Sequence, residues 1–170
     1  MKYLIFAVLL TLSSISEGKV LDKGNNGFTI EISIVTDKPI PQAYQQFLNV
    51  GEWWNSDHTW FGDAQKMSID ASVGGCFCEV DGDKQAIHMT VSYVEPNKEV
   101  RMIGGLGPLQ MMGVHGGMSW SFKQLESGKT QITHRYQVTG YSDKGLDKLA
   151  PVVDQVQTIQ LNRLKEILEK

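Results

Sequence analysis

The sequence of 170 residues has little excess charge of either sign, with 16 Lys and Arg against 19 Asp and Glu and a formal net charge of −3. It therefore lacks the basic surplus that nucleic-acid-binding domains carry, and we expect no nucleic-acid partner. No Gly-x-x-x-x-Gly-Lys-Ser/Thr motif is present, so a phosphate-binding loop is not supported. No metal cluster, cofactor motif or nucleophile–base–orienter set is visible, and we expect neither metal nor cofactor and assign no catalytic residue.

The sequence also lacks an apolar run long enough to span a bilayer. Its longest such stretch, Tyr3 to Leu12, follows Lys2 and precedes small residues, which resembles a secretory signal. We predict a signal peptide over residues 1–18, cleaved after Ser16 or Gly18, and a periplasmic or secreted protein without stable membrane insertion after cleavage. A buried N-terminal strand or helix is the alternative.

No internal repeat, low-complexity tract or long linker divides the rest of the chain. Residues 19–26 are polar and rich in Gly and Asn, so we expect a flexible segment there. Residues 27–170 are enough for one domain with a sizeable core, and too few for two.

Cysteine is scarce: Cys76 and Cys78 are the only two. They would share one face of a predicted strand, and in an exported protein a disulfide is the first possibility. However, Cα atoms two residues apart on a strand are about 6.6 Å apart, near the upper limit for a bridge. A thiolate metal site with His88 is a second alternative. The favoured prediction is two packed thiols that behave as small apolar side chains.

Two periods in the apolar pattern define the fold class. Alternation at period two predicts strands, for example at 28–35, 87–93, 118–123 and 132–138. The C-terminal stretch changes to the period of a helix that buries one face, through Leu149, Val153, Val156, Gln160, Leu164 and Ile167. Gln160 interrupts this stripe, so its side chain either has a hydrogen-bond partner inside or faces a cavity. The class is α+β.

Two segments without a regular period are rich in adaptable apolar side chains. Trp53, Trp54, Trp60 and Phe61 lie within nine residues, together with Asp57 and His58. They form either aromatic plugs that seal one end of the core or the wall of an apolar pocket. Residues 104–117 contain six glycines and two adjacent methionines, which is typical of a flexible loop at a pocket mouth.

Several of these segments resemble the START/SRPBCC superfamily, which includes polyketide cyclases, lipid-transfer domains and homologues of the heat-shock ATPase activator. The matching pieces are residues 73–79, the turn at 94–96 leading to 100–102, residues 120–122 and 128–130, and the final helix. More narrowly, residues 53–60 and 104–110 are similar to exported members. The resemblance implies a helix-grip fold: a curved antiparallel sheet wrapped around a long C-terminal helix, with two short helices near the N-terminus. It also implies an apolar cavity between sheet and helix and, as the default, a small hydrophobic ligand.

The orientation of one strand pair is ambiguous. The resemblance places Phe77 and Glu79 toward the cavity, and a two-residue turn at Gly82-Asp83 would pair Phe77 with His88 and bring Glu79 and His88 inside together. The alternation of Ile87, Met89 and Val91 instead points those three inward. We expect Glu79 inside and leave the face of His88 open.

The predicted ligand-binding residues come from all of these segments: Trp53, Trp54, His58, Trp60, Phe77, Glu79, His88, Met112, Trp120, His134, Tyr136, Val156 and Gln160. The expected function is to bind or carry a small hydrophobic molecule. The alternative is an enzyme of cyclase, dehydratase or hydrolase type that uses Glu79 and a histidine as acid and base. A single inward histidine such as His134 is more often a structural residue. The sequence identifies neither the ligand nor the oligomeric state.

Overall fold

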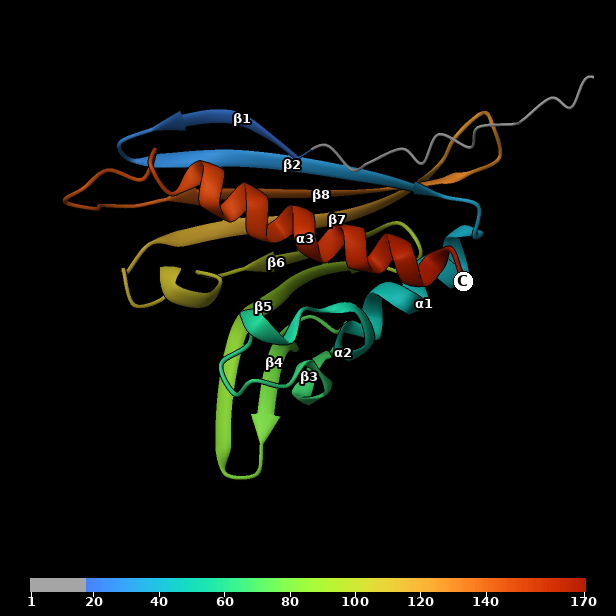
Figure 1. Ribbon diagram of the computed structural model, residues 1–170, viewed down its shortest axis with the longest axis horizontal. Coiled ribbons are helices and arrows are strands. Elements are labelled where there is room, and N and C mark those ends of the chain that lie inside the picture. Colours follow the sequence, from blue (N-terminus) through green and yellow to red (C-terminus); the bar gives the residue numbers. More distant parts are fainter. Residues whose placement is uncertain (1–17) are drawn as a thin grey trace, which may run out of the picture.

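The computed structural model describes residues 18–170, so the predicted signal peptide lies outside the described residues apart from Gly18. One antiparallel sheet of eight strands, in the order β1-β2-β8-β7-β6-β5-β4-β3, curves around the long C-terminal helix α3, Ala150–Leu168 (Figure 1). The strands are β1 Gly18–Gly24, β2 Gly27–Thr36, β3 Met67–Ile69, β4 Cys76–Asp81, β5 Lys84–Glu95, β6 Glu99–Ile103, β7 His115–Gln124 and β8 Thr130–Thr139. The predicted α+β helix-grip fold is confirmed.

Short helices close one end of this arrangement. They are α1 Ile40–Leu48 and α2 Val50–Trp53, followed by the 3-10 turns η1 Ser56–His58 and η2 Ala64–Lys66. Pro41 lies in the first turn of α1, where its missing N–H costs nothing, and Ala43, Tyr44 and Phe47 are buried on one face. A further 3-10 turn, η3 Gly107–Leu109, lies in the glycine-rich loop between β6 and β7. No helix within residues 18–170 is long and apolar enough to cross a membrane.

The inner face of the sheet is set by the alternation seen in the sequence. In β8, His134 pairs with Ile32 of β2 on one side and with Trp120 of β7 on the other. All three side chains are buried on the inner face of the sheet, while their chain neighbours face outward. The register is therefore fixed by the need to keep one apolar face inside.

The buried face of α3 differs from the predicted stripe. Gln157, Gln160, Leu161 and Leu164 are almost completely buried, whereas Val153 and Val156 are only half-buried. The helix is thus rotated, so that glutamines lie on the innermost face. A polar residue at these positions needs a partner or a cavity.

The first strand corrects one prediction. Residues 19–26 were expected to be flexible, but residues 18–24 form β1 and pair with β2 from Gly18 opposite Ile32 to Gly24 opposite Gly27. The segment is polar because most of β1 is exposed at the edge of the sheet. Composition alone predicted flexibility, but the backbone hydrogen bonds to β2 order this edge strand.

The β4–β5 pair contains an irregularity that explains the ambiguous apolar pattern of these strands. Phe77 pairs with Met89 and Cys78 with Ile87, so the pairing omits His88, which is the extra residue of a β-bulge. The bulge resets the alternation: Ile87 is 57% exposed, while His88 and Met89 are both buried. Glu79 is buried as predicted, and His88 lies inside with it. The turn at Gly82-Asp83 keeps its two-residue length, so the bulge resolves the ambiguity.

The same irregularity bears on the cysteines. Cys76 and Cys78 form a disulfide, so the prediction of two packed thiols is wrong. That prediction assumed a regular strand, with Cα atoms about 6.6 Å apart. The observed separation of the two Cα atoms is 5.3 Å, within the usual range for a bridge, and the pairing with β5 shifts its register between Phe77 and Cys78.

Candidate functional site

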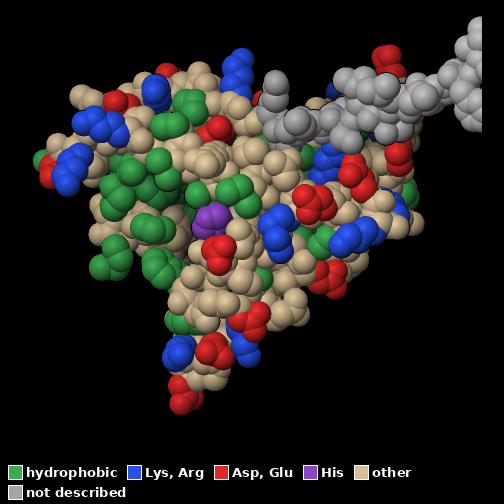
Figure 2. Space-filling view, in the orientation of Figure 1, with side chains coloured by type: hydrophobic (Ala, Val, Ile, Leu, Met, Phe, Trp, Pro, Cys, Tyr) green, Lys and Arg blue, Asp and Glu red, His purple; other side chains and the backbone are tan. Residues whose placement is uncertain are grey.

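A cavity of about 390 Å³ lies between the first half of α3, the tryptophan-rich loop after α2, the η3 loop and the sheet. Its lining is mostly apolar, with a few polar groups. The lining residues are Trp54, Asp57, His58, Thr59, Trp60, His88, Leu106, Gly107, Pro108, Leu109, Met112, Tyr136, Leu149, Val152, Val153, Val156 and Gln157. This volume is within the range of about 300–1,000 Å³ that is usual for small-molecule sites. Figure 2 shows hydrophobic side chains gathered on the surface over the η3 loop and the start of α3, beside a histidine.

The structure divides the predicted site residues into two groups. The first group lines this cavity: Trp54, His58, Trp60, His88, Met112, Tyr136 and Val156. The second lies behind the wall, either packed in the core or bonded to the loop: Trp53, Phe77, Glu79, Trp120, His134 and Gln160. Ligand contact by either group stays a prediction. Sequence reasoning missed Gln157, although its position three residues before Gln160 places both on one helix face.

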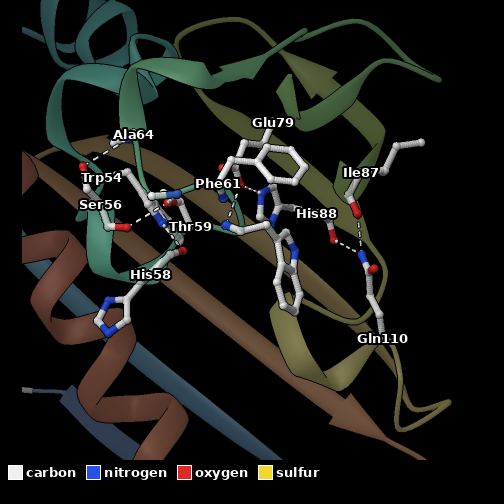
Figure 3. A network of polar contacts seen from close by, with 12 residues as sticks. Trp54, Ser56, His58, Thr59, Phe61, Ala64, Glu79, Ile87, His88 and Gln110 are labelled. Carbon is white, nitrogen blue, oxygen red and sulfur yellow. Dashed lines mark hydrogen bonds and ion pairs between the residues drawn. The ribbon is translucent and has the colours of Figure 1, made fainter. Parts of the chain in front are cut away.

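Glu79 binds the backbone of the tryptophan-rich loop through two hydrogen bonds. Its Oε2 accepts a hydrogen bond from the backbone N–H of Trp60 at 2.8 Å, and its Oε1 accepts one from Phe61 at 2.7 Å. The Nε2 atom of His88 lies 3.2 Å from Oε2 of Glu79 (Figure 3). Since both carboxylate oxygens act as acceptors, His88 donates through Nε2–H. The carboxylate is fully buried, and these three donors compensate for the loss of water.

This contact fixes the state of His88. With Nε2–H donated to Glu79, the neutral ring keeps Nδ1 as an unprotonated acceptor. Burial lowers the pKa of His88 below its ordinary value, and the hydrogen bond and charge of Glu79 oppose that shift in part. The neutral form therefore predominates at neutral pH. A carboxylate that orients a histidine is the arrangement used to prepare a general base.

Gln160 fixes the other end of the same loop. Its Oε1 accepts a hydrogen bond from the backbone N–H of Asn55 at 2.8 Å, and its Nε2 lies 2.7 Å from Nδ1 of His58. Because the amide nitrogen is a donor, Nδ1 of His58 accepts and the proton of the neutral ring lies on Nε2. Figure 3 shows His58 directed away from the Glu79–His88 pair, toward the C-terminal helix. Gln160 is thus a structural link between helix and loop.

The η3 loop is held by Tyr136 and Gln110. The Tyr136 hydroxyl accepts from the backbone N–H of Leu106 at 3.0 Å and donates to the Gly104 carbonyl at 3.2 Å. Burial raises the pKa of Tyr136 to about 12, so it stays a neutral donor. The Gln110 side chain donates to the carbonyl oxygens of Ile87 and His88 on β5. The glycine-rich segment is therefore fastened over the cavity at two points.

The core behind the cavity is aromatic. Trp120 packs against Phe47, Trp53 and the ring of His134, with the last pair of ring centroids 4.4 Å apart. Neither ring nitrogen of His134 has a hydrogen-bond partner. Complete burial lowers the pKa of His134 to about 3, so the ring is neutral. It is a core residue and takes no part in the polar network around Glu79. Across residues 18–170, no three His, Cys, Asp or Glu side chains cluster as a metal site would require.

Solved structures of low sequence identity share this fold. CalU16 from Micromonospora echinospora matches with a TM-score of 0.60 at 12% identity, over 91% of this chain and 84% of that one. DynU16, a protein from the dynemicin biosynthetic locus, matches with a TM-score of 0.57 at 14% identity, over 82% of this chain and 46% of that one. Ara h 8.0201 matches with a TM-score of 0.56 at 12% identity, over 84% of this chain and 97% of that one. The sequence matches no protein-family model and no curated protein. At these identities the comparisons establish the helix-grip fold alone.

Proposed function

We propose that the protein binds a small hydrophobic molecule in the cavity between the sheet and α3. The observation that carries this proposal is the cavity itself: about 390 Å³ of space, walled mainly by side chains such as Trp54, Leu109 and Val156. Burial of apolar ligand surface against such a wall contributes about 25 cal/mol per Å² before the cost of association is subtracted. A well-packed core fills such space with its own side chains, so the cavity is a feature that needs an occupant.

The test uses a neutral apolar dye and two matched substitutions. N-phenyl-1-naphthylamine becomes fluorescent in apolar surroundings and should bind the wild-type chain. Val156→Phe places a larger side chain in the cavity wall and should weaken dye binding at least about tenfold, equivalent to about 1.4 kcal/mol. Val73→Phe makes the same exchange at a residue that is 74% exposed and outside the lining, and it should change nothing. Equal affinity for all three proteins would contradict the proposal.

A second candidate is an enzyme of cyclase, dehydratase or hydrolase type, because one observation favours it. Glu79 lies within hydrogen-bond distance of His88, and His88 is in the cavity wall with Nδ1 unprotonated. This pair supplies an oriented base beside a mainly apolar site. The likeness to DynU16, from a biosynthetic locus, is compatible with such a role.

The enzymatic candidate has its own test. Hydrolysis of a 4-nitrophenyl ester by the wild-type protein is compared with hydrolysis by His88→Gln, whose amide nitrogen can still donate to Glu79. A general base contributes about 10²–10⁴-fold to rate. If the ester is hydrolysed equally by both proteins, or not above the buffer rate, His88 is not a hydrolytic base and the binding role stands alone.

We also propose that the chain is an exported member of the START/SRPBCC superfamily. Its membership is supported by the helix-grip fold together with the matching sequence segments. Export is supported by the apolar stretch after Lys2 and by the Cys76–Cys78 disulfide, since disulfides persist in oxidising compartments. N-terminal sequencing of the native protein tests export: a mature start at Glu17 or Lys19 is expected, and a start at Met1 would contradict it.

A further inference from the structure

The polar groups on the cavity wall differ in whether they are already hydrogen-bonded. The Thr59 hydroxyl donates to the Ser56 carbonyl at 2.8 Å and accepts from the Gly62 N–H at 2.9 Å. The Tyr136 hydroxyl likewise donates once and accepts once. Neither hydroxyl has its proton available for a ligand.

His88 has an unused acceptor. Its Nε2–H is donated to Glu79, and its Nδ1 makes no hydrogen bond with any part of the chain from residue 18 to 170. The side chain is 3% exposed, yet it contributes to the cavity wall. An unprotonated ring nitrogen in a cavity wall is available to a donor on a ligand.

A second acceptor without a partner belongs to Gln157 on α3. This residue is 1% exposed and lines the cavity, and its Oε1 has no partner. Gln160, one turn further along α3, has both amide atoms bonded. The contrast between the two glutamines indicates that Gln157 is not needed to hold the fold together.

The charges around the cavity disfavour an anion. No Lys or Arg lies among the described lining residues, and the only carboxylate there, Asp57, is exposed. A ligand carboxylate would lose its water without gaining a cation, and it would approach the buried carboxylate of Glu79. An ammonium group would also lose its water, and Asp57 is too exposed to compensate for that loss.

We propose, building on the proposed function, that the ligand is a hydrophobic molecule whose polar end is an uncharged hydroxyl, an alcohol or a phenol, which donates a hydrogen bond to Nδ1 of His88. Two acceptors lack donors, Nδ1 of His88 and Oε1 of Gln157, the lining has no Lys or Arg, and most of the other lining residues are apolar. Carboxylic acids of the same shape are therefore poor ligands. Burial also keeps His88 neutral, and so in the form that accepts.

The test compares compounds that share one apolar part and differ at one group. Butylbenzene, 4-butylphenol, 4-butylanisole, 4-butylbenzylamine and 4-butylbenzoate are titrated into the full chain by calorimetry. The phenol should bind about five- to tenfold more tightly than the anisole, which has the oxygen but no proton to donate. The benzoate and the benzylamine should bind more weakly than the phenol.

Two histidine substitutions assign the effect to one atom. His88→Gln keeps a donor to Glu79 and removes the Nδ1 acceptor, so the preference for phenol over anisole should fall below about twofold. His115→Gln is the same exchange at an exposed residue outside the cavity lining, and it should keep the full preference. If His88→Gln does not fold, the order of affinities for the wild-type chain decides alone.

The outcomes separate this inference from the proposed function. Equal binding of phenol and anisole, or tighter binding of benzoate or benzylamine, overturns the hydroxyl assignment and leaves a hydrophobic site in place. Full phenol preference in His88→Gln overturns the role of His88. If not even butylbenzene binds, the proposed function fails, and the inference fails with it.

Discussion

Gln157 and Gln160 lie one turn apart on α3 and differ in one respect that mutation can test. Gln160→Leu removes the acceptor for the Asn55 N–H and the donor to His58. A buried polar group left without its partner costs about 1–3 kcal/mol. Because Asn55 and His58 are only half-buried, we expect a loss of about 2 kcal/mol, which lowers Tm by roughly 4–8 °C in a domain of this size.

Gln157→Leu is the matched control, with the same exchange at a site where Oε1 has no partner. It should leave stability unchanged or raise it by about 1 kcal/mol. Thermal unfolding of both variants without ligand gives the comparison, and amide exchange should show faster opening of residues 54–60 in Gln160→Leu alone. The reasoning is refuted if Gln160→Leu unfolds at the wild-type temperature, or if the two variants lose equal stability.

Three further predictions concern other parts of the molecule. The intact mass under non-reducing conditions should be lower than that of the reduced chain by the two hydrogens lost on forming the Cys76–Cys78 bridge. Serine at both positions should lower the free energy of unfolding by about 1.5 kcal/mol, since the closed loop is short. An unchanged mass on reduction would show free thiols. His134 has a pKa of about 3 against an ordinary value of 6.5, so below pH 6.5 the unfolded chain takes up a proton that the folded chain does not. Denaturant titrations of wild type and His134→Leu should then diverge by about 1.4 kcal/mol per pH unit as the pH falls from 6.5 toward 3, and parallel curves would contradict complete burial of a neutral ring. A secreted or periplasmic fraction should contain the native protein, and its recovery only from the cytoplasm would contradict export.

Regular periodicity predicted the elements of the fold well, because it reports which face of an element is buried. The strands around Ile32, Trp120 and His134 and the helix over residues 150–168 follow directly from it. Where the backbone departs from regularity, the pattern misleads. The bulge at His88 turned two successive side chains inward, and it accompanied the close approach of the two cysteines.

The site was predictable in its segments and less so in its residues. The tryptophan-rich loop does form a wall, yet Trp54 and Trp60 line the cavity while Trp53 packs in the core. Aromatic composition cannot distinguish these roles, because it does not determine which way a loop side chain points. Gln157 escaped notice because a polar residue at the edge of a predicted apolar stripe is ordinary. Only the observed rotation of α3 places it inside.

The most direct test of the central claim is native mass spectrometry of the protein purified from its own host, in the wild-type form and as Val156→Phe. The wild-type protein should carry a small-molecule adduct that organic solvent removes, and Val156→Phe should carry little or none, since the larger side chain occupies the space. A wild-type protein without any adduct, or the same adduct on both proteins, would contradict a ligand-binding cavity between the sheet and the C-terminal helix.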